Sequence, residues 1–87
     1  MLYEDKHTKL KKGDRLVWQR STGRIMATRD DSTHLHWHVG RCEADNKSAL
    51  VCDQYASRMV VDMIADSLDL RIERRNGTDG NVIYTLI

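Results

Sequence analysis

The chain has 87 residues, of which 40% are apolar and 31% are charged. This length leaves room for one domain, and the composition is that of a globular domain with a very polar surface, not that of a disordered chain. The net charge of +1 excludes a strong overall basic field of the kind that attracts nucleic acid.

Cysteine content and hydropathy predict the compartment. The two cysteines, Cys42 and Cys52, are fewer than a secreted domain of this size usually carries. No apolar run approaches the roughly 18 residues of a membrane span, and the first residues lack the apolar segment of a signal peptide. We therefore expect a cytoplasmic protein with reduced thiols and no membrane contact.

The first part of the chain is basic. Residues 1–24 contain seven Lys and Arg against three acids, whereas residues 25–70 contain four against eight. We expect residues 1–13 to form a polar, flexible or loosely docked lead-in, and residues 14–87 to form the domain.

Three strands are predicted before the middle of the chain. Residues 15–20 and 24–29 alternate between apolar and polar side chains, and the turn residues 21–23 join them into a hairpin. Residues 33–39 show the clearest alternation, because apolar residues and histidines follow one another with the period of two that a strand has.

Residues 47–67 are predicted to form the single helix, and this helix has two apolar sides. We expect the first side to lie on the sheet and the second to be exposed and to bind a partner, since exposed apolar surface often marks an interface. The first side consists of Cys52, Ala56, Met59, Val60, Met63 and Ile64. The second consists of Leu50, Val51, Val61, Ala65 and Leu68, with Arg58 among them. The alternative is that a terminal segment of the chain covers the second side.

Residues 70–75 and 81–87 are predicted to form a second hairpin. Its turn contains Asn76 and Gly77, a strong hairpin signal, and the loop has either two residues with a bulge or five residues. The predicted order is β-β-β-α-β-β. It specifies an α+β fold in which one amphipathic helix packs on a mainly antiparallel sheet.

The histidine row in residues 33–39 raises the question of a metal site. His34, His36 and His38 project from one face of a strand, with neighbours about 7 Å apart. Two of them can converge on one zinc ion, which binds nitrogen at about 2.0–2.1 Å, and Cys42 can add a thiolate. The other interpretations are an exposed row of polar side chains or a pH sensor.

Basic side chains near the predicted hairpins suggest a nucleic-acid interface, because arginines at hairpin tips can grip phosphates. The alternative is that they only keep exposed strands soluble. The candidates are Lys11, Lys12, Arg20, Arg24, Arg71, Arg74 and Arg75.

No residue pattern predicts catalysis. The sequence contains no recognisable serine triad, phosphate-binding glycine loop or paired-carboxylate cleft, and a single cation beside Cys42 does not make that thiol a nucleophile. We expect a protein that is not an enzyme and that carries no cofactor.

These patterns favour a protein-binding domain that acts by contact, as a homodimer or as an inhibitor of a larger macromolecular machine. Its character is that of small phage or mobile-element proteins that block a host defence nuclease. The alternatives are a nucleic-acid-binding domain that uses arginine-tipped hairpins and a histidine-ligated metal module.

Overall fold

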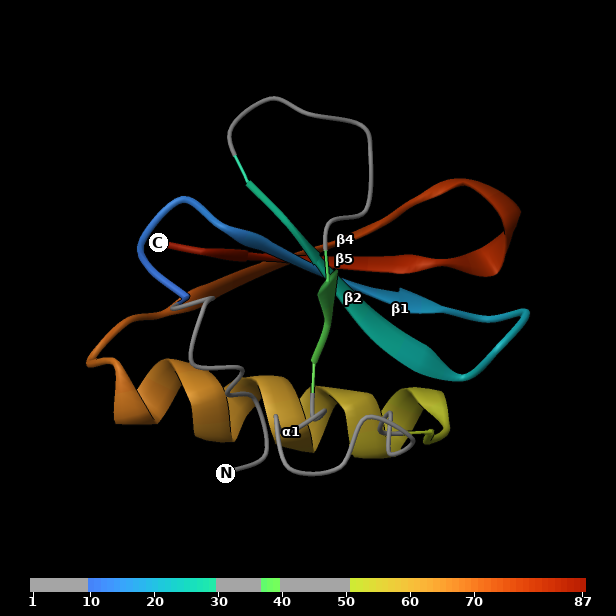
Figure 1. Ribbon diagram of the computed structural model, residues 1–87, viewed down its shortest axis with the longest axis horizontal. Helices are drawn as coiled ribbons and strands as arrows, with labels where there is room; N and C mark the ends of the chain where they lie inside the picture. The colour runs from blue at the N-terminus through green and yellow to red at the C-terminus, as the bar shows by residue number, and fades with distance from the viewer. Residues whose placement is uncertain (1–9, 30–36, 40–50) are drawn as a thin grey trace.

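The computed structural model of the protein describes residues 10–29, 37–39 and 51–87. Figure 1 shows a sheet with the helix packed along one of its faces. The elements in chain order are β1 (Arg15–Gln19), β2 (Arg24–Thr28), β3 (Trp37–His38), α1 (Gln54–Ser67), β4 (Ile72–Asn76), the short 3-10 helix η1 (Thr78–Gly80) and β5 (Val82–Leu86).

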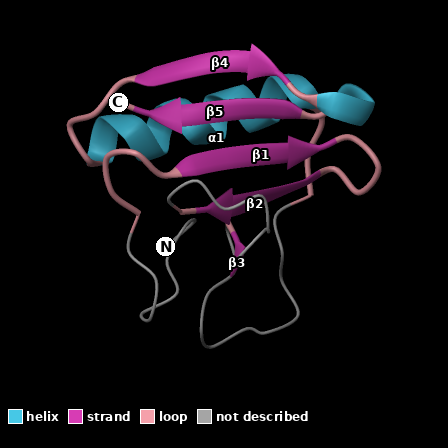
Figure 2. Ribbon diagram, turned by 90° about the horizontal axis from the view of Figure 1, so that it is seen from above, coloured by secondary structure: helices cyan, strands magenta, loops and turns pink. Residues whose placement is uncertain are grey.

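The sheet is antiparallel throughout and has the order β3-β2-β1-β5-β4. Figure 2 shows the helix lying behind the sheet, with its axis roughly in the direction of the strands. The two hairpins are joined through β1 and β5, so β5 is a central strand and β4 is an edge strand. This confirms the predicted α+β class.

The predicted third strand lies only partly within the described residues. Residues 33–39 were expected to form a full strand, but β3 contains only Trp37 and His38 within the described residues. Among residues 10–29, 37–39 and 51–87, the sheet has four strands of five residues, together with the two residues of β3, which pair with β2. The backbone N–H of Val39 also donates to the Ile25 carbonyl at 2.8 Å, which adds a contact between this segment and β2.

The helix begins later than the sequence predicts. Gln54 is its first residue, and Asp53 caps it through a hydrogen bond from the Ala56 N–H to the Asp53 carboxylate at 2.8 Å. A carboxylate at this position accepts from a backbone N–H that has no partner in the helix. Val51 lies before the cap and pairs in a single bridge with Arg24 of β2, so this part of the predicted helix 47–67 is not helical.

The core lies between the sheet and α1. One face of β1, β2 and β5 supplies the larger part of it, because alternate residues of these strands are buried. The buried apolar residues are Leu10, Leu16, Trp18, Ile25, Ala27, Val39, Val61, Ile64, Ala65, Val82, Tyr84 and Leu86. Leu10, at the end of the predicted lead-in, is therefore docked, and the N–H of Gly13 donates to the Leu86 carbonyl at 2.7 Å.

The side of α1 that faces the sheet contains residues of both predicted sides. Ile64 is buried and Val60 packs against the core as expected, but Val61 and Ala65 of the other side are buried beside them. Val61 is 0% exposed and Ala65 is 4% exposed, so the expectation that they form an exposed partner-binding sector is wrong. Leu68 is partly buried and packs against the same core. Of the stripe that was expected to face the sheet, Met59 and Met63 are exposed.

The reason for this orientation is the shape of the space beneath the helix. The ring of Tyr84 on β5 fills much of it, and Ser57, which is 0% exposed, lies against the tyrosine hydroxyl with 3.2 Å between their oxygens. A short side chain fits there, whereas a long one would force the helix away from the sheet. The hydroxyl of Ser57 also donates to the Gln54 carbonyl at 2.7 Å, so this buried polar group has a hydrogen-bond partner.

A buried carboxylate fixes the start of β1. Asp14 is 1% exposed and accepts hydrogen bonds from Nε of Arg29 at 3.1 Å and from Nη2 of Arg29 at 3.0 Å. The other contact is the Lys11 N–H, which donates to the same carboxylate at 3.0 Å. This carboxylate thereby links the turn before β1 to the end of β2.

In the part of the chain that the structure describes, no helix combines the length and the apolar character needed to cross a membrane.

Candidate functional site

The outward side of α1 carries a row of large apolar side chains. Tyr55 is 86% exposed, Met59 is 66% exposed and Met63 is 57% exposed. Residues four apart lie on one side of a helix, so these three, which we call the outer row, form one continuous strip. Exposed apolar residues that stand singly need no explanation, but an ordered strip of them on a small domain does.

The outer row was not predicted, because the buried side of α1 lies between the two apolar sides that the sequence pattern separates. Met59 and Met63 were assigned to the core and Tyr55 to neither face. Of the residues predicted to bind a partner, Val51 and Arg58 are exposed as expected, and Leu50 lies outside the described residues. The spacing of Val51, Tyr55, Met59 and Met63, each four residues from the next, was the signal available.

Charged side chains border the outer row. Arg58 contacts Asp62 one turn further along the helix, with its Nε at 3.2 Å from both carboxylate oxygens. Both side chains are about half exposed, so this pair contributes only about 0.3–0.5 kcal/mol to stability. Asp66 is also exposed. The positive charge therefore lies towards the start of the helix and the negative charges towards its end.

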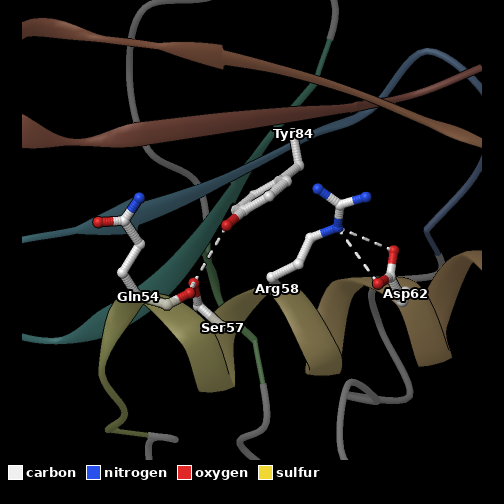
Figure 3. A network of polar contacts seen from close by, with 5 residues as sticks. All are labelled: Gln54, Ser57, Arg58, Asp62 and Tyr84. Carbon is white, nitrogen blue, oxygen red and sulfur yellow. Dashed lines mark hydrogen bonds and ion pairs between the residues drawn. The ribbon is translucent and has the colours of Figure 1, made fainter.

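A hollow of about 270 Å³ lies where the start of α1 approaches β4. Its lining comes from three elements: Gln54, Tyr55 and Arg58 from α1, Arg74 from β4 and Tyr84 from β5. Figure 3 shows the Arg58 side chain rising from the helix towards the sheet, with its terminal nitrogens beside Tyr84 and away from Asp62. The hollow therefore combines two guanidinium groups with aromatic and amide side chains.

The strand register explains why Arg74 reaches this hollow. Arg74 is paired with Tyr84 on β5, whereas the next residue, Arg75, is paired with Ile83. Successive side chains of a strand point to opposite faces, so Arg74 lies on the helix side of the sheet and Arg75 on the other side. No hydrogen bond or ion pair joins the Arg74 side chain to another described residue.

The residues proposed for nucleic-acid binding do not form one patch. Lys11 and Lys12 are exposed in the turn before β1, at the end of the sheet where β5 finishes. Arg71 lies at the same end, since its N–H donates to the Ile87 carbonyl at 2.9 Å.

The remaining basic candidates lie elsewhere. Arg20 is at the opposite end of the sheet, where its N–H donates to the Asn81 side chain at 3.1 Å. Arg24 begins β2 at that end, and Arg74 and Arg75 lie on opposite faces of β4. The described candidates are therefore distributed over both ends and both faces of the sheet, and the nucleic-acid alternative stays a prediction.

The metal hypothesis falls mostly outside the described residues. His34, His36 and Cys42 lie there, and only the backbone of His38 is described. Among the residues that are described, no group of three or more His, Cys, Asp or Glu could hold a metal ion. The histidine row therefore stays a prediction.

Cys52 is held in place just before α1. Its carbonyl accepts from the Trp18 indole N–H at 2.9 Å, and its own N–H donates to the Gly23 carbonyl at 2.7 Å. Burial, and in smaller part the neighbouring Asp53 carboxylate, raise the pKa of the Cys52 thiol above its ordinary value. A raised pKa leaves less thiolate at neutral pH, which is the opposite of what a nucleophile requires.

Cys52 is therefore expected to react slowly with iodoacetamide at pH 7, and faster only as the pH passes the ordinary thiol range. Asp53→Asn keeps a capping side chain but removes the charge, so it should lower this pKa and speed the reaction at a fixed pH. Rates are measured by mass spectrometry in a Cys42→Ser background, so that one thiol is followed. A reaction as fast as that of an unstructured cysteine peptide would contradict the expectation.

Comparisons of the chain with protein-family models, with curated proteins and with solved structures gave no match. The function is therefore inferred from the outer row and the hollow beside it.

Proposed function

We propose that this chain is a non-enzymatic protein-binding domain, and that its contact surface is the outward side of α1. The observation that carries the proposal is the outer row of Tyr55, Met59 and Met63, three exposed apolar side chains in one strip. Tyr, Met and Arg are enriched at the centres of protein interfaces, and Met adapts its shape to a partner surface.

The partner that best fits this surface is a second copy of the chain. Arg58 lies in the first half of the helix, and Asp62 and Asp66 lie in the second half. Two such helices packed antiparallel place the basic part of each beside the acidic part of the other, while the outer rows meet between them. Opposite charges that face each other favour this orientation over the parallel one.

The area of the outer row limits how strongly two copies of the chain are expected to associate. A stable interface covers about 800 Å² on each partner, and an aromatic side chain contributes about 150–250 Å². Three side chains therefore supply the centre of an interface but not its full area, and charged neighbours must form the rim. We expect a weak dimer that forms as the protein is concentrated.

The double variant Met59→Glu, Met63→Glu tests this proposal. Both side chains are exposed, so the variant should fold normally, but two added carboxylates in each outer row should repel across the interface. Light scattering over a concentration series should show the wild-type mass rising from one chain towards two, and the variant remaining at one. Circular dichroism and thermal melting check that the fold is unchanged.

The matched control is Ser21→Glu with Thr78→Glu, which makes the same change in net charge at the two hairpin tips. This control should associate like the wild type. A wild type that stays monomeric at the highest concentration would exclude a second copy as the occupant of the outer row. Equal loss of association in both double variants would show that net charge, not the outer row, controls it.

The narrower predictions, that the protein inhibits a larger host machine and that it is cytoplasmic, stay predictions.

A further inference from the structure

We propose that the hollow between α1 and β4 is a binding site for an oxyanion, a phosphate or carboxylate group carried on a small carbon skeleton. This inference concerns small anions and does not depend on whether the outer row binds a protein.

The donors that would hold the anion come from two elements that the fold brings together. Arg58 is on α1, and Arg74 is on β4, sixteen residues later. A guanidinium presents a planar fork of N–H donors that matches two oxygens of a carboxylate or phosphate. Two such forks that converge on one hollow bind an oxyanion more specifically than isolated surface arginines do.

Arg58 is directed towards the hollow in the absence of an anion. Its Nε is occupied by Asp62, so that the side chain is directed towards the sheet and its terminal nitrogens lie beside Tyr84 (Figure 3). Asp62 offsets part of the Arg58 charge, and Arg74, without an ion pair to a described residue, leaves the hollow positive.

Gln54 and the tyrosines indicate which other groups the ligand can carry beside its charged oxygens. The amide of Gln54 can donate to an oxygen, and the exposed ring of Tyr55 supplies aromatic surface for the carbon part, while Tyr84 is buried beneath the hollow. The Tyr84 hydroxyl is already paired with Ser57 (Figure 3), so it serves as a fixed wall.

The volume limits the size of the ligand. A cavity of about 150 Å³ accommodates benzene, whereas pockets for complete small-molecule ligands begin at about 300 Å³. The hollow, at about 270 Å³, therefore holds a charged group with a small attached fragment and not a large cofactor.

The test is a titration followed by NMR of the arginine side-chain and backbone N–H signals. The probes are inorganic phosphate, phenyl phosphate and benzoate, each at constant ionic strength maintained with sodium chloride, because exposed charges are sensitive to salt. We expect saturable shifts at Gln54, Tyr55, Arg58 and Arg74. Phenyl phosphate should bind more tightly than inorganic phosphate, and the comparison with benzoate shows whether phosphate or carboxylate is preferred.

Two neighbouring residues give a matched pair of variants. Arg74→Gln removes one fork from the hollow and should weaken binding about tenfold or more, as expected for a lost hydrogen bond to a charged group. Arg75→Gln makes the same chemical change on the opposite face of the same strand and should leave the affinity within about twofold of the wild type. Shifts that fail to saturate, or an equal loss of affinity in both variants, would overturn the proposal.

Discussion

Val61→Glu is expected to prevent the domain from folding. Val61 is fully buried between α1 and the sheet, and an ionised carboxylate placed there without a partner costs at least several kcal/mol. A small domain has a total stability of about 5–15 kcal/mol, and this thin core has little reserve. Circular dichroism should show lost secondary structure, without a cooperative thermal transition.

Met63→Glu is the control for this substitution. It lies on the same helix, two residues further on, but more than half of its side chain is exposed, and surface substitutions usually change stability by no more than about 0.5 kcal/mol. The sequence pattern predicts the reverse pair of results, because it places Met63 in the core and Val61 at the surface. A folded Val61→Glu together with an unfolded Met63→Glu would show that the helix is rotated from the orientation described above.

Asp14→Ala is expected to lower the free energy of unfolding by about 3 kcal/mol, the lower end of the range for breaking a buried ion pair. The substitution removes the acceptor of three hydrogen bonds, two from Arg29 and one from the Lys11 N–H. We expect the decrease in the free energy of unfolding to be at the lower end of this range because the Arg29 side chain is 32% exposed and can turn towards water. Urea denaturation followed by circular dichroism measures the change.

The conservative variant Asp14→Asn separates the contribution of the hydrogen bond from the Lys11 N–H from that of the charge interaction with Arg29. Asparagine keeps the size of the side chain and an oxygen that can accept from the Lys11 N–H, but it loses the charge that faces Arg29. The free energy of unfolding of Asp14→Asn should therefore lie between that of the wild type and that of Asp14→Ala. If Asp14→Ala proved as stable as the wild type, the link between the turn before β1 and the end of β2 would not contribute to stability.

The sheet could be predicted largely from local sequence. The alternation in residues 15–20 and 24–29 defines β1 and β2, and the same period identifies the face that enters the core. For the second hairpin, the five-residue alternative for its loop is the one observed, since residues 77–81 join β4 to β5 and the Gly77 N–H donates to the Asn81 carbonyl at 2.8 Å. These features depend on residues that are close together in the chain.

The orientation of the helix could not be predicted in the same way. Periodicity shows that α1 has two apolar sides, but it does not show which residues of each side meet the sheet, where Ile64 of one side is buried with Val61 and Ala65 of the other. That choice depends on Tyr84, which is 27 residues from Ser57 in the chain and fills the space beneath the helix. The hollow depends on an equally distant contact, because the registers of β4 and β5 decide that Arg74, and not Arg75, lies on the helix side. Candidate site residues were therefore harder to identify than strands.

The edge strand β4 has a consequence for how the protein behaves when it is concentrated. An edge strand offers unpaired backbone groups to any strand of another molecule, and a long apolar edge invites aggregation. In β4 three successive residues, Glu73, Arg74 and Arg75, are charged and exposed. Adding another strand to this edge would strip water from these charged side chains, which disfavours strand addition and fibril growth. The arginines of this strand therefore protect the domain from aggregation, whatever else they bind.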